Sequence, residues 1–308
     1  MKFIPSAYVL IFFLAACGDT SEELATQGIA LDSDDIAGVV SSGDGPEAGV
    51  WVIAETDDLE TRFARIVVTD DDGQYLVPDL PDANYQLWVR GYGLVDSAKT
   101  AAIPGETVNL AATVAPDAAA AAKTYPAAYW YSMMHLPTED EAADLDGGLN
   151  FYLTWVKNMG CVGCHQLGNE ATRTIPPALA EIESSEEAWI RRISSGQAGN
   201  TMIRLAAQNL NGLPIKYMAE WTDRIAAGEI PATTPERPTG VERNVVATVR
   251  DWSSAQFYMH DLSGTDRRDP TVNGYGKLYG APELSTDEMP ILDPVANSAG
   301  IFNVPVRD

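Results

Sequence analysis

The chain of 308 residues contains few cysteines and little positive charge. Cysteine occurs three times, at Cys17, Cys161 and Cys164, which is too few for a small domain held together by several disulfides. Lys and Arg number 20 against 44 Asp and Glu, so the formal net charge is −24. This balance excludes a general nucleic-acid binder, because such a protein needs a basic surface to neutralise phosphates.

The apolar run at residues 7–16 is too short to cross a membrane. It has ten residues, whereas a spanning helix needs about 20. Following Lys2, the run is typical of the h-region of a signal peptide, so residues 1–16 are predicted to be removed.

The residues Leu14-Ala15-Ala16-Cys17 resemble the lipobox of bacterial lipoproteins. The resemblance implies cleavage before Cys17, acylation of its thiol, and a lipid-anchored position on the periplasmic side of the cell envelope. Two or more acyl chains anchor a protein stably. Because Gly18 rather than Asp follows the cysteine, the outer membrane is expected rather than the inner membrane. The alternative is an ordinary secreted protein whose Cys17 is incidental.

Residues 36–115 are predicted to form an all-β sandwich, attached through a lipidated tether over residues 17–35. Seven short β-rich runs recur about every ten residues. Turn clusters such as Asp70-Asp71-Asp72-Gly73 separate them, and this spacing is typical of an antiparallel sandwich.

Two segments of this region, Thr69-Asp-Asp-Asp-Gly-Gln-Tyr75 and Leu80-Pro-Asp-Ala-Asn-Tyr85, resemble the carboxypeptidase regulatory-like domain, a transthyretin-like sandwich. The resemblance implies a module for adhesion or carbohydrate contact and no peptidase. A zinc peptidase would need a His-x-x-Glu pair and a further His, which the chain's three histidines do not supply. The aromatic candidates for stacking on a sugar, which are alternatively core residues, are Trp51, Tyr85, Trp88 and Tyr92.

Beyond a linker at residues 116–126, the pattern over residues 127–231 predicts an all-α domain. Amphipathic periodicity predicts helices over residues 149–158, 188–194 and 214–227. A capping box, Ser184-Ser-Glu-Glu187, precedes the second of them.

The most specific pattern in the sequence is Cys161-Val-Gly-Cys164-His165. C-x-x-C-H is the attachment motif of c-type haem. One helical turn places both thiols where they can add to the two vinyl groups of haem, and the adjacent imidazole then faces the iron. The motif therefore predicts one covalently attached haem c, with His165 as an iron ligand.

Three other interpretations of the motif fit less well. A structural zinc site would need further cysteines or a nearby histidine. A thioredoxin-like pair needs no histidine after the second cysteine and usually follows a strand. A disulfide across two intervening residues would constrain almost nothing.

The surrounding residues resemble a monohaem class I cytochrome c domain. Ile175-Pro176-Pro177-Ala178-Leu179 resembles a family segment in which a backbone carbonyl accepts a hydrogen bond from the proximal imidazole. Residues 189–196, followed by Met202, resemble the family's helix, glycine and ligand methionine. The resemblance implies Met202 as the distal ligand.

Other distal ligands remain open. Met218 is the first alternative, although it shares a helical face with apolar residues, and His135 and His260 are further ones. A vacant distal position would instead suggest small-ligand or peroxide chemistry. The candidate partners of the haem propionates, which are alternatively ordinary surface arginines, are Arg173, Arg191 and Arg192.

Residues 232–308 are predicted to form a short β-rich segment. Residues 261–270 and 274–280, with Leu292-Asp-Pro294, resemble the junction at which a cytochrome leads into a β-propeller related to streptogramin lyase. A closed propeller needs at least about four blades of four strands, so the resemblance implies an incomplete propeller.

The sequence thus predicts a multidomain chain: a β-sandwich, an all-α cytochrome c domain and a β-rich end. The expected function is single-electron transfer to or from a redox protein partner, such as a dehydrogenase or terminal acceptor, by a carrier rather than a catalyst. Two alternatives remain: a glycan- or envelope-binding module with a structural or sensory haem, and a fragment of a propeller lyase or peroxidase-like enzyme. Residues 1–126 hold 20 acidic and 6 basic residues, which favours solubility over steering of a basic partner to the haem.

Overall fold

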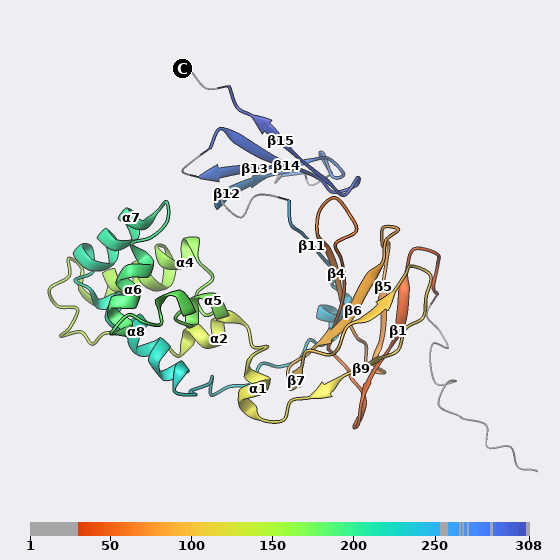
Figure 1. Cartoon of the computed structure of the whole chain (residues 1–308), viewed down its shortest axis with the longest axis horizontal. Helices are drawn as coiled ribbons and strands as arrows, with labels where there is room; N and C mark the ends of the chain where they lie inside the picture. Colours follow the sequence, from red (N-terminus) through yellow and green to blue (C-terminus); the bar gives the residue numbers. More distant parts are fainter. Residues whose placement is uncertain are drawn as a thin grey trace, which may run out of the picture.

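The computed structural model describes residues 30–252, 258–264, 266, 268–269, 271–283 and 286–305. It has a β-rich N-terminal region, a helical middle and a strand-containing C-terminal part, arranged as an arc (Figure 1). This confirms the predicted multidomain order at that level. Cys17 and the lipobox lie outside the described residues. None of the described helices is long and apolar enough to span a membrane.

Two main sheets enclose the core of the N-terminal region, here called the sandwich. In the first, β1 has β2 and β5 as antiparallel neighbours and β9 as a parallel one. Its strands are β1 (Ile36–Ser42), β2 (Gly45–Pro46), β5 (Gln74–Val77) and β9 (Leu110–Ala111). The second sheet has the order β11-β4-β3-β6-β8. Its strands are β3 (Trp51–Thr56), β4 (Phe63–Val68), β6 (Tyr85–Arg90), β8 (Thr100–Ala102) and β11 (Ala247–Arg250).

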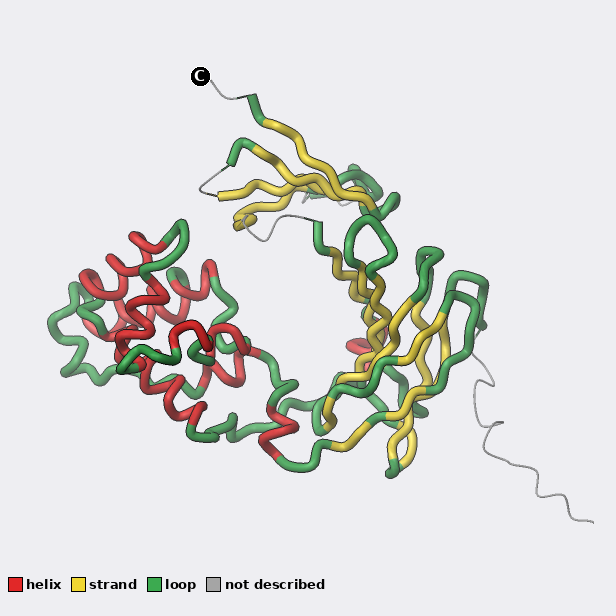
Figure 2. Tube along the Cα trace, viewed as in Figure 1, coloured by secondary structure: helices red, strands yellow, loops and turns green. Residues whose placement is uncertain are grey.

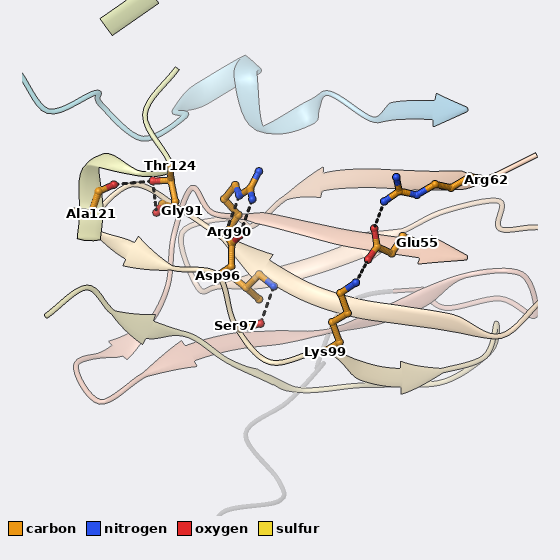
Figure 3. A network of polar contacts seen from close by, with 10 residues as sticks. Glu55, Arg62, Arg90, Gly91, Asp96, Ser97, Lys99, Ala121 and Thr124 are labelled. Atoms are coloured by element: carbon orange, nitrogen blue, oxygen red, sulfur yellow. Dashed lines mark hydrogen bonds and ion pairs between the residues drawn. The ribbon is translucent and has the colours of Figure 1, made fainter. Parts of the chain in front are cut away.

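Alternating burial explains why these runs form a sandwich. Along β6, Tyr85, Leu87 and Val89 are buried, while Gln86 and Arg90 are exposed, as expected of a strand with one face on a core. Figure 3 shows polar contacts at this sheet, where the largely buried Glu55 side chain is bonded to the exposed side chains of Arg62 and Lys99.

The predicted turn after β4 forms, but it connects the two sheets and is not a hairpin, because β4 pairs with β3 and β11 whereas β5 pairs with β1. Asp70 Oδ1 accepts hydrogen bonds from the backbone N–H groups of Asp72 (2.9 Å) and Gln74 (2.8 Å). Gly73 has a φ of +72°, a conformation that glycine adopts without steric cost. This local geometry leads the chain directly into β5.

Strand β11 reaches the sandwich only after the chain has passed through the helical part. It pairs antiparallel with β4, from Ala247 opposite Ile66 to Arg250 opposite Phe63. The sequence pattern predicts these residues to belong to the C-terminal segment, whereas the structure places them in the sandwich's second sheet. The helical unit is therefore an excursion between β10 (Thr113–Val114), which pairs with β7 (Leu94–Val95), and β11.

The helical unit (residues 118–226) consists of short helices around one core. Its helices are α1 (Ala118–Ala122), α2 (Ala127–Ser132), α3 (Gly148–Leu153), α4 (Cys161–Cys164), α5 (Glu170–Arg173), α6 (Ser185–Ile193), α7 (Gly199–Ile203) and α8 (Leu213–Ala226). Two π-helices, η1 (Thr154–Asn158) and η3 (Arg204–Asn209), continue α3 and α7. Two 3-10 turns, η2 (Pro177–Leu179) and η4 (Gly240–Asn244), follow α5 and α8 in the chain.

Large side chains of α8 hold this unit together. Trp221 is fully buried, and its Nε1 donates to the carbonyl oxygen of Trp130 at 2.9 Å. The ring of Tyr217 meets that of Tyr152 edge-on, with centroids 6.4 Å apart. At the start of α6, Ser184 Oγ accepts from the backbone N–H of Glu187, as the capping box predicts.

A row of aromatic rings joins the sandwich to the helical unit. Trp51 meets Tyr92 at 4.9 Å, Tyr92 meets Tyr125 at 6.1 Å, and Tyr125 meets Tyr129 at 6.2 Å between ring centroids. Close by, the Thr124 hydroxyl donates to the carbonyl of Gly91 at 3.5 Å (Figure 3). The residues expected to be a linker therefore form α1 and a packed junction.

The C-terminal part is one four-stranded antiparallel sheet with its strands in chain order. The strands are β12 (Tyr258–Ser263), β13 (Leu278–Glu283), β14 (Glu288–Asp293) and β15 (Ser298–Asn303). Arg250 at the end of β11 donates to Asn297 Oδ1 (2.8 Å) and to the Pro294 carbonyl (3.0 Å). These bonds hold the sheet beside the end of the sandwich (Figure 2).

Candidate functional site

The C-x-x-C-H motif forms a single helical turn. Helix α4 spans Cys161–Cys164, and the backbone N–H of His165 closes the turn on the Cys161 carbonyl at 3.0 Å. His165 itself is extended (φ −124°, ψ 136°), so the chain leaves the helix directly after the second cysteine. Cys161 is half-buried, whereas Cys164 and His165 are exposed.

A cavity of about 470 Å³ lies against this turn. Its walls include Cys161, Cys164 and His165 from the motif together with Met202, which lies 37 residues beyond His165 in the sequence. The remaining lining residues are mostly apolar or aromatic: Trp155, Met159, Gly160, Leu167, Thr172, Trp189, Arg192, Ile193, Ala198, Thr201, Leu205, Ala206, Leu210, Pro214, Ile215 and Met218. A largely apolar cavity with a few convergent polar groups is the usual form of a cofactor site.

One face of α7 and η3 forms a wall of this cavity. Ala198, Thr201, Met202, Leu205 and Ala206 all line it, and their spacing of three and four residues places them on one side of a helix. Met202 is half-buried there. The helical geometry thus presents the Met202 thioether to the cavity that holds the two cysteines.

Two other methionines also line the cavity. Met218, on α8, is 6% exposed, and Met159, just before the motif, is 60% exposed. Met218 is therefore a buried wall residue with a thioether at the cavity, and Met159 lies at its opening.

Four of the residues considered as haem contacts are placed elsewhere. Pro176 and Pro177 do not line the cavity, and their carbonyls accept from the N–H groups of Leu179 (2.8 Å) and Ala180 (3.1 Å). His135 Nδ1 lies 2.8 Å from Glu220 Oε1, also outside the cavity lining. His260 is on β12, and its side chain lies outside the described residues.

The arginine candidates have different environments. Arg192 lines the cavity, stacks over the Trp189 ring at 5.0 Å, and donates to the carbonyls of Thr174 and Ala171. Burial lowers the pKa of its guanidinium below the usual value. Arg173 is 9% exposed and lies over the Trp130 ring at 4.2 Å. Of the two, Arg192 is the one that reaches the cavity.

The sequence analysis did not identify the aromatic walls or the π-helices. Trp155 from η1 and Leu205 from η3 both line the cavity, and a Cβ at Gly160 would approach both residues, 2.6 Å from the Trp155 carbonyl oxygen and 3.3 Å from Leu205 Cδ2. Single π-helical turns are frequent at functional sites. No local sequence signal distinguishes these turns from ordinary α-helix.

Two properties of the motif bear on zinc and thiol redox chemistry. Burial raises the pKa of the Cys161 thiol to about 11, whereas redox-active cysteines have lowered pKa values. Within the described residues, the single group of three potential ligands gathered closely enough to hold a metal is Asp32, Asp34 and Asp35 in the sandwich. The motif's cysteines and histidine do not gather that closely in the described structure.

The comparisons of this chain with known proteins give no support for the cavity as a cofactor site. No protein-family model matches the chain, and no curated protein matches it. Among solved structures, a type II cohesin–X-dockerin complex from Acetivibrio cellulolyticus is similar over 26% of this chain and 58% of that chain, at 12% identity and a TM-score of 0.21. The Bacillus anthracis TIE protein is similar over 26% of this chain and 16% of that chain, at 17% identity and the same TM-score.

Proposed function

We propose that the protein carries one covalent haem c in this cavity and passes single electrons to and from a redox protein partner. The main observation in support of this proposal is that one cavity is lined by Cys161, Cys164, His165 and Met202. These are the two thiols, the imidazole and the thioether that a haem c with His/Met ligation requires.

The side chains of the cavity fit a haem. Cys161 and Cys164 would hold the macrocycle as thioethers, His165 would be the proximal ligand, and Met202 the distal one. The apolar and aromatic walls, among them Trp155 and Leu205, would cover the porphyrin and exclude water. Haem c supplies one-electron iron chemistry when bound, and a methionine ligand raises its potential.

Arg192 is the residue that we expect to contact the anionic propionates of the haem. Arg192 lines the cavity, and its guanidinium is held by two carbonyls and by the Trp189 ring. An arginine fixed in this way is suited to a carboxylate. We therefore assign a haem propionate to Arg192.

We further propose that the chain is a lipoprotein anchored at Cys17, with the sandwich as a spacer or docking module between membrane and haem. Carbohydrate contact has less support. Trp51 and Tyr92 pack against each other and toward Tyr125, and Tyr85 is fully buried. Of the four aromatic candidates, Trp88 is the one outside these contacts; it is half-buried and stacks with Arg90 at 4.9 Å.

The finer fold assignments are proposals of the same kind. The helical unit is assigned to the class I cytochrome c family on its motif and on the order of helices around the cavity. The C-terminal sheet has four antiparallel strands in chain order, which is the make-up of one β-propeller blade. We assign it to that architecture.

The experiment that tests the function is haem retention on a denaturing gel. The full chain, expressed with a c-type cytochrome maturation system, should keep haem after denaturation, and Cys161→Ala with Cys164→Ala should lose it. A wild-type chain that releases all its haem on denaturation contradicts covalent attachment.

The ferric spectrum then tests the ligands: Met202→Ala should lose the weak near-infrared band of methionine-ligated haem and bind cyanide faster. A high-spin wild-type spectrum contradicts Met202 ligation.

A further inference from the structure

One buried hydroxyl of the helical unit lacks a hydrogen-bond partner. Tyr152, on α3, is fully buried, and its hydroxyl oxygen is bonded to no other described residue. A buried polar group left unpaired lowers stability, because it has given up its bonds to water without replacement. Such groups are rare in folded proteins and require an explanation. The hydroxyl of Tyr152 is therefore free to donate to a further acceptor.

The neighbouring tyrosines of the core do not share this property. The Tyr131 hydroxyl donates to the Val156 carbonyl oxygen at 2.7 Å. The Tyr217 hydroxyl likewise has a carboxylate acceptor at 2.7 Å. In the described helical unit, the one other buried side-chain polar atom without a hydrogen bond is Arg224 Nε, and its guanidinium is ion-paired. The unpaired hydroxyl of Tyr152 is thus an exception within a core whose polar groups are otherwise satisfied.

The Tyr152 hydroxyl lies beside the first cysteine of the motif. Cys161 packs against the buried core that includes Tyr152. Burial raises the pKa of Tyr152, and Tyr131 and Cys161 contribute to the same shift, which requires both groups to lie within electrostatic reach of the hydroxyl. Cys161 lines the cavity, whereas Tyr152 does not. The hydroxyl therefore lies behind the cavity wall, on the side of Cys161.

We propose that Tyr152 is a positioning residue whose hydroxyl donates a hydrogen bond to the Cys161 sulfur when that sulfur is held as a thioether. The inference rests on the proposed function, because haem attachment is what converts this thiol into a thioether. A thioether sulfur carries no proton, so it acts as an acceptor. The Tyr131 hydroxyl also lies near Cys161, but the Val156 carbonyl holds it. This leaves Tyr152 as the available donor.

The bond acts on the motif from the core side. It holds the Cys161 sulfur in one position, and hydrogen bonding around a haem is one of the means by which a protein sets its potential. A donor at this sulfur withdraws electron density from the attached macrocycle, which favours the reduced state. Loss of the Tyr152 hydroxyl should therefore lower the reduction potential, an effect that a role in core packing alone does not produce.

A double-mutant cycle tests this bond in the haem-loaded full chain. Cys161→Ala keeps one thioether, at Cys164, but removes the sulfur assigned to Tyr152. In the chain with both cysteines, Tyr152→Phe should lower the folding equilibrium constant about two- to tenfold and lower the midpoint potential. In the Cys161→Ala background, the same change should leave the potential unaltered and cost no stability, because the hydroxyl again has no acceptor. Urea unfolding and redox titration measure the two quantities.

Tyr131→Phe is the matched control. Its hydroxyl has a backbone acceptor, so its loss should cost the same stability in both backgrounds and leave the potential unchanged. Equal effects of Tyr152→Phe in the two backgrounds would show a purely structural role and overturn the inference. An unchanged potential in Tyr152→Phe alone also overturns it, and this measurement does not depend on the folding of the Cys161→Ala chain. A wild-type chain that keeps no haem on the denaturing gel contradicts the proposed function instead, so the two failures are distinguishable.

Discussion

The Cα of Gly160 faces the backbone carbonyl of Trp155 so closely that an added Cβ would lie 2.6 Å from its oxygen. This contact fixes the C-x-x-C-H motif against the π-helix that precedes it. The same Cβ would lie 3.3 Å from Leu205 Cδ2, in the second π-helix. Gly160 therefore packs the motif against η3, which continues the helix α7 that carries Met202.

Replacing Gly160 should loosen the packing of both π-helices against the motif. In Gly160→Ala, the Cβ must displace backbone rather than a flexible side chain, so we expect a loss of about 1–3 kcal/mol in unfolding free energy. The near-infrared band of the ferric protein should also weaken. Gly163→Ala is the matched control, because a Cβ there meets nothing within 4 Å. Equal stability of the two variants in urea unfolding would contradict the proposed contact.

Met202 and Met218 line the same cavity but should respond differently to substitution. Met218 is 6% exposed, so Met218→Ala should cost about 2–5 kcal/mol through the space it leaves. Met218→Leu should keep the methionine band because Met202 still supplies the thioether. Met202→Leu should abolish that band with less effect on stability. Loss of the band in Met218→Leu alone would assign the ligand to Met218.

Glu141 should make the stability of the helical unit depend on pH. The Lys216 ammonium, the Thr138 N–H and the Tyr217 hydroxyl together lower the pKa of its carboxyl to about 2. A carboxyl whose pKa is lower in the folded state stabilises the fold above its unfolded pKa, and this contribution is lost as the pH falls toward the folded value.

Glu141→Gln should therefore be less stable than wild type at pH 7. The difference should shrink as the pH falls from about 4.5 toward about 2, measured as urea midpoints. Glu139→Gln, on the same exposed loop, serves as the control. A constant difference across this range would show that the carboxylate charge is not responsible.

Arg237 should stabilise the return of the chain to the sandwich. Its guanidinium donates to Glu47 Oε2 (2.6 Å), the Ala48 carbonyl (3.1 Å) and the Tyr92 carbonyl (3.0 Å). Glu47 is 8% exposed, so Arg237→Ala leaves a buried carboxylate unpaired, at a cost of about 3–5 kcal/mol. Thermal unfolding and proteolysis of residues 232–252 measure the loss. The double variant with Glu47→Ala should recover part of it, and no recovery would contradict the pairing.

Local pattern predicted the elements better than their partners. A short β-rich run predicted β6, the capping box predicted the start of α6, and the spacing of the two cysteines predicted the helical turn α4. Strand β11 was predicted as a strand, but nothing within it indicates pairing with β4, because the two are about 180 residues apart in the chain. Long-range pairing depends on which sheet edge the folded chain meets.

The candidate site also contains residues that the sequence predicts and residues that depend on tertiary packing. Cys161, Cys164 and His165 were predicted because haem attachment fixes their types and spacing, whereas Met202 was predicted from a family resemblance, and all four line one cavity. Trp155 was not predicted, because it reaches the cavity from a π-helical turn that depends on tertiary packing. Pro176 and Pro177 do not line the cavity, and their carbonyls accept hydrogen bonds from Leu179 and Ala180; a bond from the imidazole to this segment stays a prediction of the resemblance.

The antiparallel pairing of β11 with β4 has a consequence for proteolysis. The polypeptide enters the helical unit from the sandwich and returns to it, and the Tyr125 hydroxyl bonds to Thr234 Oγ1 at 3.1 Å where the outgoing and returning segments meet. A single peptide-bond cleavage inside the helical unit would therefore leave one fragment covalently attached to the sandwich and the other hydrogen-bonded to its edge. Release of the helical unit would take two cuts, one in each connecting segment.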